Sequence, residues 1–373
     1  MRVLIAPDSF GGTLSAAEAA AAIAEGWADG AGHDTVVTRP LSDGGPGFVD
    51  VLHATLGGDL LAVAAPDPLG RTVPATVLVV GDTAYVESAQ ACGLHLLAPH
   101  ERDPKATTSY GVGVLIAAAV ETGARTIVVG LGGSGTNDGG AGALAALGAA
   151  PLGASGAALL YGGAALLECT GLAGPPRLRG AELVVASDVD NPLLGLHGAS
   201  AVYGPQKGAT PNDVQLLDAA LARWAEVLEW ELPTSPAGLG TVPGGGAAGG
   251  LGAALLALGA RRASGIGLVR DLTGFDAALD EADLVVTGEG AFDWQSLRGK
   301  VAVGVAAVAQ ERGVPCLVLA GRVDVGRREL AAAGVDGAYS LVEHLGSQER
   351  ALAEASGGLR ALADRVAREW SRV

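Results

Sequence analysis

Short apolar runs that end in polar loops open the chain. Arg2–Pro7 and Thr35–Pro40 predict two buried strands. The Ala-rich stretch that follows Ser15 predicts a helix, because Ser15 and Glu18 have the spacing of a capping box. An alternation of strand, loop and helix is typical of a parallel sheet.

The same rhythm returns near the C-terminal end. The pattern predicts a strand at Leu284–Thr287, a helix at Val301–Arg312, a strand at Pro315–Ala320 and a closing helix at Glu349–Val373. Both ends of the chain are therefore expected to contribute to one parallel sheet.

The middle of the chain has a different pattern. Leu60–Ala65, Thr72–Val80 and Thr83–Ser88 are predicted strands separated by tight turns, which indicates antiparallel pairing. Thr126–Gly130 and Glu182–Ser187 are further predicted buried strands, and each ends in a polar loop. This part is expected to form a separate mixed sheet.

These changes of rhythm predict an α/β fold with two domains. Residues 1–60 and 270–373 are expected to form a discontinuous domain with a parallel sheet. Residues 61–269 are expected to form an inserted mixed α/β domain. A length of 373 residues agrees with two domains, since a domain usually has about 100–200 residues.

Charge and composition narrow the class of protein. The net charge is −16 and no basic run offsets it, so neither nucleic acid nor an anionic membrane is an expected partner. No charged leader precedes the first strand, and the longest apolar runs are too short to span a bilayer. We expect a cytoplasmic protein whose three cysteines are buried thiols.

Acidic side chains follow the predicted parallel strands. In sheets of this kind, ligands bind beyond the carboxyl ends of the strands. Five acids stand at such ends, most of them beside glycine: Asp8, Asp43, Asp138, Asp188 and Glu289. These positions are where chemistry is expected.

A glycine-rich loop, Gly132–Gly140, follows the strand at 126. Five of its nine residues are glycine, and Ser134, Thr136, Asn137 and Asp138 stand between them. Glycines let successive amides converge on an anion, and Asn and Asp suit Mg²⁺. The alternative is a tight turn between strand and helix, but this loop is polar for a mere turn.

Two further loops could hold a ligand. Lys207 lies in a Gly-flanked loop and suits phosphate or carboxylate, with an ordinary solvated lysine as the alternative. Glu289 lies between Gly288 and Gly290, in a segment predicted to join strand and helix, and is either a turn residue or a contact for a metal or a ribose. Asp293 is either a site residue or a helix N-cap.

A dinucleotide site is a weaker interpretation. Gly130–Gly135 formally matches G-x-G-x-x-G, but 59 glycines give about one or two chance matches. No acid follows about 20 residues later at the end of a second strand. A dehydrogenase therefore remains only an alternative hypothesis, which predicts NAD(P) binding.

Taken together, these loops resemble the type I glycerate kinase family of bacteria. The resemblance runs nearly from end to end. Its motifs are Ala6–Phe10 with Gly12–Ser15, Asp43–Gly45, Asp67–Gly70, Glu87 with Gly93 and Leu94, Thr107–Thr108 with Tyr110 and Gly111, Gly132–Gly140, Asp188–Leu193, Gly204–Ala209, Ala247–Leu251, and Thr287–Gly290 with Asp293, Gln295, Gly299 and Lys300.

The resemblance implies a Rossmann-like and a mixed domain with the active site in the cleft between them. It also implies ATP, Mg²⁺ and phosphorylation of a small hydroxy acid, most simply glycerate. It leaves a homodimer open.

From this we derive a hypothesis for the site. Phosphoryl transfer depends mostly on positioning and on charge neutralisation. Catalytic roles are assigned to Asp43, Asp188 and Lys207, and Mg²⁺ to Asp138, Asp188 and Glu289. Nucleotide and phosphate binding is assigned to Gly132, Gly133, Ser134, Gly135, Thr136, Asn137, Gly288, Glu289 and Gly290, and substrate binding to Asp8, Ser9, Asp293 and Gln295.

The chain departs from the family at several loop positions. The family usually has charged or polar residues at the six positions occupied here by Gly11, Pro46, Phe48, Val112, Val114 and Ala291. Either Lys105, Lys207 and Arg322 compensate, or the substrate differs, or activity is reduced. A weak or silent relative that binds a small acid or a nucleotide is therefore the second hypothesis.

Overall fold

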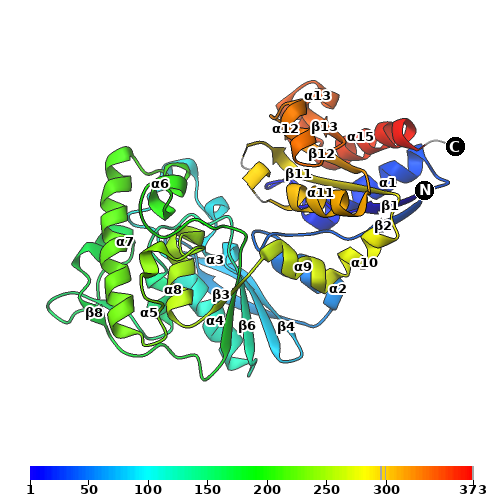
Figure 1. The fold of residues 1–373 in the computed structure, drawn as a ribbon. Helices are drawn as coiled ribbons and strands as arrows, with labels where there is room; N and C mark the ends of the chain where they lie inside the picture. The colour runs from blue at the N-terminus through cyan, green and yellow to red at the C-terminus, as the bar shows by residue number, and fades with distance from the viewer. Residues whose placement is uncertain (295, 299, 372–373) are drawn as a thin grey trace. The chain divides into compact units, whose positions relative to one another are not determined.

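The computed structural model describes residues 1–294, 296–298 and 300–371, coloured along the chain in Figure 1. The predicted α/β class is confirmed. The chain divides into two compact units. Unit 1 comprises Met1–Asp43, Asp50–Thr55 and Ile266–Val373, and unit 2 comprises Gly44–Val49 and Leu56–Gly265.

Unit 1 is built on a five-stranded sheet in the order β13-β12-β11-β1-β2, and every pair in it is parallel. Counted within the unit, the order is 2-1-3-4-5, which is the flavodoxin type of doubly wound sheet. The order reverses between β1 and β11. The strands are β1 (Arg2–Ile5), β2 (Thr35–Thr38), β11 (Leu284–Phe292), β12 (Cys316–Val323) and β13 (Gly337–Ser340).

Strand β11 corrects one sequence prediction. It was expected to end at Thr287, yet it continues through Gly288–Gly290 to Phe292. The reason is its partner, because β12 pairs with it as far as Phe292 and Val323. Gly288 and Gly290 were expected to lie in a loop, but pairing with β12, a strand distant in sequence, holds this segment in the sheet.

Helices α1 (Ala16–Gly30) and α15 (Ala355–Trp370) pack closely together in unit 1, as Figure 1 shows. The predicted capping box at Ser15 is confirmed at the start of α1. Gly26 makes the close approach feasible, since a Cβ there would lie 2.0 Å from the carbonyl oxygen of Arg360. The buried side chain of Trp27 belongs to the core around this contact.

The closing helix is interrupted, whereas one continuous helix was predicted. Glu354 leaves helical geometry, with φ −113° and ψ 29°, and separates two helices. The helices of the unit beyond α1 and α15 are α9 (Gly265–Thr273), α10 (Phe275–Asp280), α11 (Val301–Arg312), α12 (Arg327–Ala332), α13 (Leu341–Leu345) and α14 (Gln348–Ala353); α2 (Phe48–Leu56) has residues in both units.

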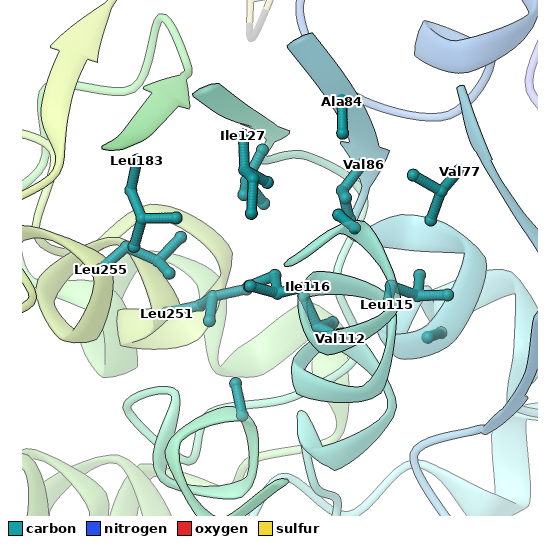
Figure 2. Packing of buried hydrophobic residues seen from close by; sticks show 14 of the residues in the cluster. Val77, Ala84, Val86, Val112, Leu115, Ile116, Ile127, Leu183, Leu251 and Leu255 are labelled. Atoms are coloured by element: carbon teal, nitrogen blue, oxygen red, sulfur yellow. The ribbon is translucent and has the colours of Figure 1, made fainter. Parts of the chain in front are cut away.

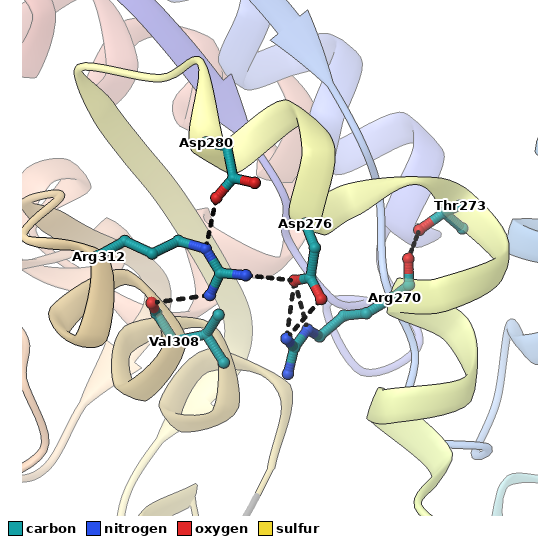
Figure 3. A network of polar contacts seen from close by, with 6 residues as sticks. All are labelled: Arg270, Thr273, Asp276, Asp280, Val308 and Arg312. Atoms are coloured by element: carbon teal, nitrogen blue, oxygen red, sulfur yellow. Dashed lines mark hydrogen bonds and ion pairs between the residues drawn. The ribbon is translucent and has the colours of Figure 1, made fainter.

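A charged network joins α9, α10 and α11 (Figure 3). Arg270 holds Asp276 through both of its donating nitrogens, at 3.1 and 2.7 Å. Arg312 donates to Asp280 at 2.7 Å and also lies 3.9 Å from Asp276. Because these groups are partly exposed, each pair contributes at most about 1 kcal/mol, and the network mainly fixes how the helices meet.

Unit 2 is built on a six-stranded sheet in the order β10-β9-β6-β5-β4-β3. The predicted antiparallel pairing is confirmed for the first three strands, and the last four run parallel. The strands are β3 (Asp59–Pro66), β4 (Thr72–Val80), β5 (Thr83–Glu87), β6 (Thr126–Gly130), β9 (Glu182–Ala186) and β10 (Arg261–Ala263); a separate pair is formed by β7 (Pro151–Leu152) and β8 (Gly171–Leu172).

Apolar side chains from alternate strand positions form the core of unit 2 (Figure 2). Val86 and Ile127 face Ile116 of α4 and Leu251 of α8 across this core. The helices of the unit are α3 (Ala89–Cys92), α4 (Tyr110–Glu121), α5 (Ala141–Ala146), α6 (Ala199–Tyr203), α7 (Pro211–Glu231) and α8 (Leu251–Ala257).

The three cysteines are free and buried, as predicted: Cys92, Cys169 and Cys316. Among the helices that the structure describes, none combines the length and the apolar character needed to cross a bilayer.

Two glycine-to-alanine substitutions in unit 1 should change the free energy of unfolding in opposite directions. Replacing glycine by alanine within a helix usually stabilises it by about 0.5–1 kcal/mol. Gly26→Ala should instead lower the free energy of unfolding by about 1–3 kcal/mol, because its methyl group would overlap the backbone of Arg360. Gly357→Ala in α15 is the control, since its Cβ would meet nothing within 4 Å and should stabilise. Urea unfolding of the two variants measures the difference, and stabilisation by both would contradict the packing described.

Candidate active site

The glycine-rich loop of unit 2 connects β6 to α5 at the carboxyl edge of the sheet. Two of its amides donate to other segments, Gly135 to Cys92 O at 2.7 Å and Gly139 to Gly249 O at 3.0 Å. Of the predicted phosphate-binding residues, Gly135, Thr136 and Asn137 are buried, while Gly133 is exposed and Gly132 partly so. The surface that can meet an anion is therefore the first part of the loop, Gly132–Ser134.

Asp138 is enclosed at the far end of this loop. Its Oδ2 accepts hydrogen bonds from the amide and the hydroxyl of Ser109, at 2.8 and 2.9 Å, and from the Gly142 amide at 3.1 Å. Its Oδ1 accepts from the Gly140 amide. Burial raises the pKa of Asp138, and these hydrogen bonds oppose that shift. The prediction of Asp138 as a metal ligand is not supported, because its oxygens already hold the loop to α5.

Lys207 is also buried, at 1 % exposure, rather than lying in a solvated loop. Its Nζ donates to Ser134 Oγ at 2.9 Å and to Thr136 O at 2.7 Å. No carboxylate in the described part of the chain lies within 4 Å of this ammonium group. Burial lowers the pKa of Lys207 to about 8, with Cys92 and Asp138 acting in the opposite direction. A positive charge without a paired anion thus stands directly behind Ser134.

Asn137 has a mixed environment. Its Nδ2 donates to Ser200 Oγ at 2.9 Å, but its buried Oδ1 has no partner among the described residues. An unpaired buried acceptor costs about 1–3 kcal/mol. The amide holds α6 to the loop, so a direct contact with phosphate is not its evident role.

Asp188 follows β9, the neighbour of β6. Its Oδ1 accepts from Ser264 Oγ at 2.6 Å and from the Gly265 amide at 3.1 Å. The carboxylate therefore fixes the segment in which α9 begins. Because both donors belong to this segment, the geometry favours a positioning role for this oxygen.

Glu87 holds the loop that follows Asp43, and it is not among the predicted site residues. It ends β5, is 5 % exposed, and accepts from the Gly47 and Val49 amides at 3.1 and 3.2 Å. This contact holds the glycine-rich segment that follows Asp43. The sequence signal that points to it is a glutamate near the end of a predicted buried strand.

Unit 1 has its own acidic cluster at the carboxyl edge of its sheet. Asp8 follows β1, Asp43 follows β2, and Glu289 lies in β11, so the cluster stands where the strand order reverses. Ligands bind at such switch points in open α/β sheets. The pKa of Asp8 is raised well above its usual value, first by burial and then by the carboxylates of Asp43 and Glu289. The structure thus brings these three predicted residues together electrostatically.

Glu289 is the deepest acid of this cluster. It is 4 % exposed, and its pKa is raised by burial and opposed by Lys300. Lys300 Nζ lies 3.4 Å from Oε2, whereas Oε1 has no hydrogen-bond partner within the described part of the chain. Flanking Gly290 lies close to Phe10 and Gly11, which a side chain would disturb.

The contacts of Ser9 and Asp293 that the structure gives are local hydrogen bonds with residues nearby in the sequence. The Ser9 amide donates to Asp8 Oδ1 at 2.7 Å. Asp293 accepts from the Ser296 amide at 3.4 Å, which fits the N-cap alternative for a short turn of helix at Ser296–Arg298. Gln295 lies outside the described residues.

The carboxylates of Glu289 and Asp8 suit Mg²⁺ better than the predicted set of Asp138, Asp188 and Glu289 does. In the described ranges, no three His, Cys, Asp or Glu side chains are arranged as a complete metal site. Mg²⁺ in kinases usually needs only one or two carboxylates, because phosphates and water supply the other ligands. The unpaired Oε1 of Glu289, beside the high-pKa carboxyl of Asp8, is suited to that use.

Comparison with protein families gives one result for the whole chain. A family model described as "Glycerate kinase family" matches residues 3–371. The match includes every loop described above.

Individual proteins agree with this result. A glycerate kinase of Halalkalibacterium halodurans is 40 % identical over 371 residues, with 98 % of this chain and 97 % of that protein covered. The glycerate 2-kinase of Escherichia coli K12 is 42 % identical over 361 residues, covering 94 % and 93 %. A crystal structure from Salmonella typhimurium LT2, provisionally assigned as glycerate kinase 2, has a TM-score of 0.78 and 41 % identity, covering 98 % and 97 %.

The buried charge of Lys207 predicts an unusual dependence of stability on pH. Burial lowers its pKa to about 8, so between that pH and its ordinary value of 10.5 the unfolded state binds more protons than the folded state. The stability of the wild type relative to Lys207→Met should therefore rise as the pH increases through about 8. Urea unfolding at a series of pH values measures this difference.

Lys105→Met provides the control. Asp103 and Asp213 raise the pKa of Lys105, so its contribution to stability should stay level through this range and fall only above 10.5. If the stability difference between the wild type and Lys207→Met does not change with pH, as expected for Lys105→Met, the ammonium group of Lys207 is not buried as described.

Proposed function

The chain belongs to the glycerate kinase family, and we propose that it transfers the γ-phosphoryl group of ATP to a hydroxyl of glycerate. The observation that carries the proposal is the near-complete match, since the family model spans residues 3–371. Kinases of this family use ATP. The name of the Escherichia coli relative, a glycerate 2-kinase, favours the C2 hydroxyl as the acceptor.

We assign phosphate binding to the first part of the glycine-rich loop in unit 2. No partner in the described chain takes up the amides of Gly132 and Gly133, and Lys207 places a positive charge behind Ser134. In a chain with a net charge of −16, a local positive potential of this kind is what an anionic ligand requires.

We assign Mg²⁺ to Glu289 with Asp8 in unit 1. When bound, Mg²⁺ would neutralise phosphate charge during transfer. The residues themselves support this assignment, because a buried carboxylate with an unpaired oxygen and a neighbouring acid with a raised pKa both favour a cation. Asp138 is not assigned to Mg²⁺, because its carboxylate holds the loop to Ser109 and α5.

We assign the orientation of the substrate hydroxyl to Asp43. The alternative, Asp188, holds the segment in which α9 begins, whereas Asp43 belongs to the acidic cluster with Asp8. A base contributes less in phosphoryl transfer than charge neutralisation does, since the transition state is loose. Ser9, Asp293, Gly288 and Gly290 stay predicted contacts, and so does the placement of the active site in a cleft between two domains.

The departures from the family pattern are partly packing changes. Val112 is fully buried in the core of unit 2 (Figure 2), and Val114 packs against it. Phe48 is fully buried and lies edge-on to Tyr85, with ring centroids 6.3 Å apart. Apolar residues at these three positions strengthen packing, which weakens the argument for a silent relative.

Of the other three departures, Pro46 lies in unit 2, and two lie in unit 1. Ala291 pairs in register with Arg322, whose guanidinium group forms an ion pair with Asp324. Gly11 is exposed, with a φ of +37°. The neighbouring strand thus carries a cation at Arg322, and Asp324 balances its charge.

The purified protein should convert ATP and glycerate to ADP and phosphoglycerate in the presence of Mg²⁺. Coupled detection of ADP measures turnover, and phosphorus NMR of the product identifies the esterified hydroxyl. The 2-phosphate is expected. If ATP–Mg²⁺ binds in calorimetry but no acid in a panel of small hydroxy acids is phosphorylated, the silent-relative hypothesis is correct instead.

Substitutions should separate the proposed roles. Asp43→Asn is expected to lower kcat by about 10²-fold with little change in the Mg²⁺ requirement. Glu289→Gln should raise the Mg²⁺ concentration needed for half-maximal activity by about tenfold or more, because it removes the charge that attracts the cation. Asp190→Asn is the matched control, since Asp190 has 82 % side-chain exposure and pairs with Arg262. Its kcat/KM should stay within about twofold of wild type.

An unchanged Mg²⁺ requirement in Glu289→Gln would remove this residue from the metal site. A similar loss in all three variants would indicate a general electrostatic effect rather than separate roles.

A further inference from the structure

Unit 2 contains a cavity of about 170 Å³ on the side of α5. Ala141 and Ala145 of α5 form one wall, and Tyr110, Leu159 and Tyr161 form others. Leu160 and Tyr161 are 86 % and 57 % exposed, so the cavity reaches the surface at this point. None of the site residues assigned above lines it.

Aromatic and aliphatic side chains line this cavity, and backbone groups and tyrosine hydroxyls add polar surface to its walls. Tyr110 and Tyr161 meet edge to face, with ring centroids 5.3 Å apart and an interplanar angle of 62°. None of the described residues that line the cavity carries a charge. The hydroxyl groups of the two tyrosines have no hydrogen-bond partner within the described ranges, so they remain available to a ligand.

Size and chemistry together limit the ligand. An apolar protein cavity of about 150 Å³ accommodates a benzene molecule. A cavity of about 170 Å³ therefore suits one small planar ring system. The tyrosine rings favour an aromatic partner through edge contacts, and their hydroxyls favour one with a polar edge. A charged group would find no counterion on these walls.

We propose that this cavity, which we name the Tyr110–Tyr161 pocket, binds a small neutral aromatic ring. Two sources could supply that chemistry, the adenine ring of ATP or a separate aromatic effector. The pocket itself does not depend on the proposed function, and only the adenine source rests on it.

The pocket is mechanically linked to the glycine-rich loop. Gly142 lines the pocket, and its amide donates to Asp138 at 3.1 Å. Tyr110 directly follows Ser109, which donates twice to the same carboxylate. Behind Gly162, another lining residue, Gly163 lies so close to Asn137 that a Cβ would be 2.4 Å from its carbonyl oxygen. A ring that orders these walls should also order the loop.

Indole is the first probe, because it is a neutral ring system of suitable size. Calorimetric titration of the full-length protein is expected to show saturable binding at one site. Ala145→Phe should fill the pocket, whereas Tyr161→Ala should remove one aromatic wall. Each substitution should weaken indole binding by about tenfold or more. Ala154→Phe is the control, since Ala154 is exposed on the same loop and does not line the pocket. It should bind indole like the wild type.

Because Ala145→Phe could unfold the unit, its thermal transition is compared with that of the wild type, and Tyr161→Ala, a change at an exposed side chain, gives an independent reading. No saturable binding of indole or adenosine by the wild type would overturn the proposal. Binding that both pocket variants retain would overturn it as well.

Competition identifies the source of the ring. If ATP–Mg²⁺ displaces indole, and adenosine does so without phosphates, the pocket receives adenine. If ATP–Mg²⁺ binds while indole stays bound, the pocket serves a separate aromatic effector. Both results support an aromatic-ring site, and neither depends on whether glycerate is phosphorylated, so failure of the proposed function would leave this test intact.

Discussion

Two buried charged residues, Lys207 and Asp138, hold the glycine-rich loop Gly132–Gly140 of unit 2 in place. Lys207 donates to Ser134 and Thr136 near the start of the glycine-rich loop, and Asp138 anchors its end to Ser109 and α5. Neither group is compensated by an ion pair in the described structure. Burying such charges is costly, so they persist only where backbone and hydroxyl groups satisfy them. That requirement fixes the loop in one conformation and leaves a positive potential at Ser134.

Local features of the fold could be predicted from the sequence, whereas features set by distant partners could not. The capping box at Ser15 and the limits of β4 depend on neighbouring residues, and both were predicted correctly. The extension of β11 through Glu289 depends on β12, which local patterns do not contain. The burial of Lys207 depends on a carbonyl 71 residues away. Polar spacing located the candidate site, but it could not separate side chains that meet a ligand from those that hold the loops.

The two sheets supply complementary chemistry. In unit 2 the loop after β6 offers backbone amides, and Lys207 lies beside its Ser134; these groups suit phosphate. The switch point of unit 1 has carboxylates, which suit a cation. A kinase needs both, because the transferred group is anionic and Mg²⁺ neutralises part of its charge. Membership of the glycerate kinase family and these two sets of residues therefore lead to the same proposal. The Tyr110–Tyr161 pocket adds an aromatic site with a structural link to the phosphate loop.

A crystal structure with Mg²⁺ and a non-hydrolysable ATP analogue tests the central claim most directly. Phosphate oxygens are expected within about 3 Å of the backbone amides of Gly132–Ser134. Phosphates bound elsewhere, with Gly132–Ser134 unoccupied, would contradict it.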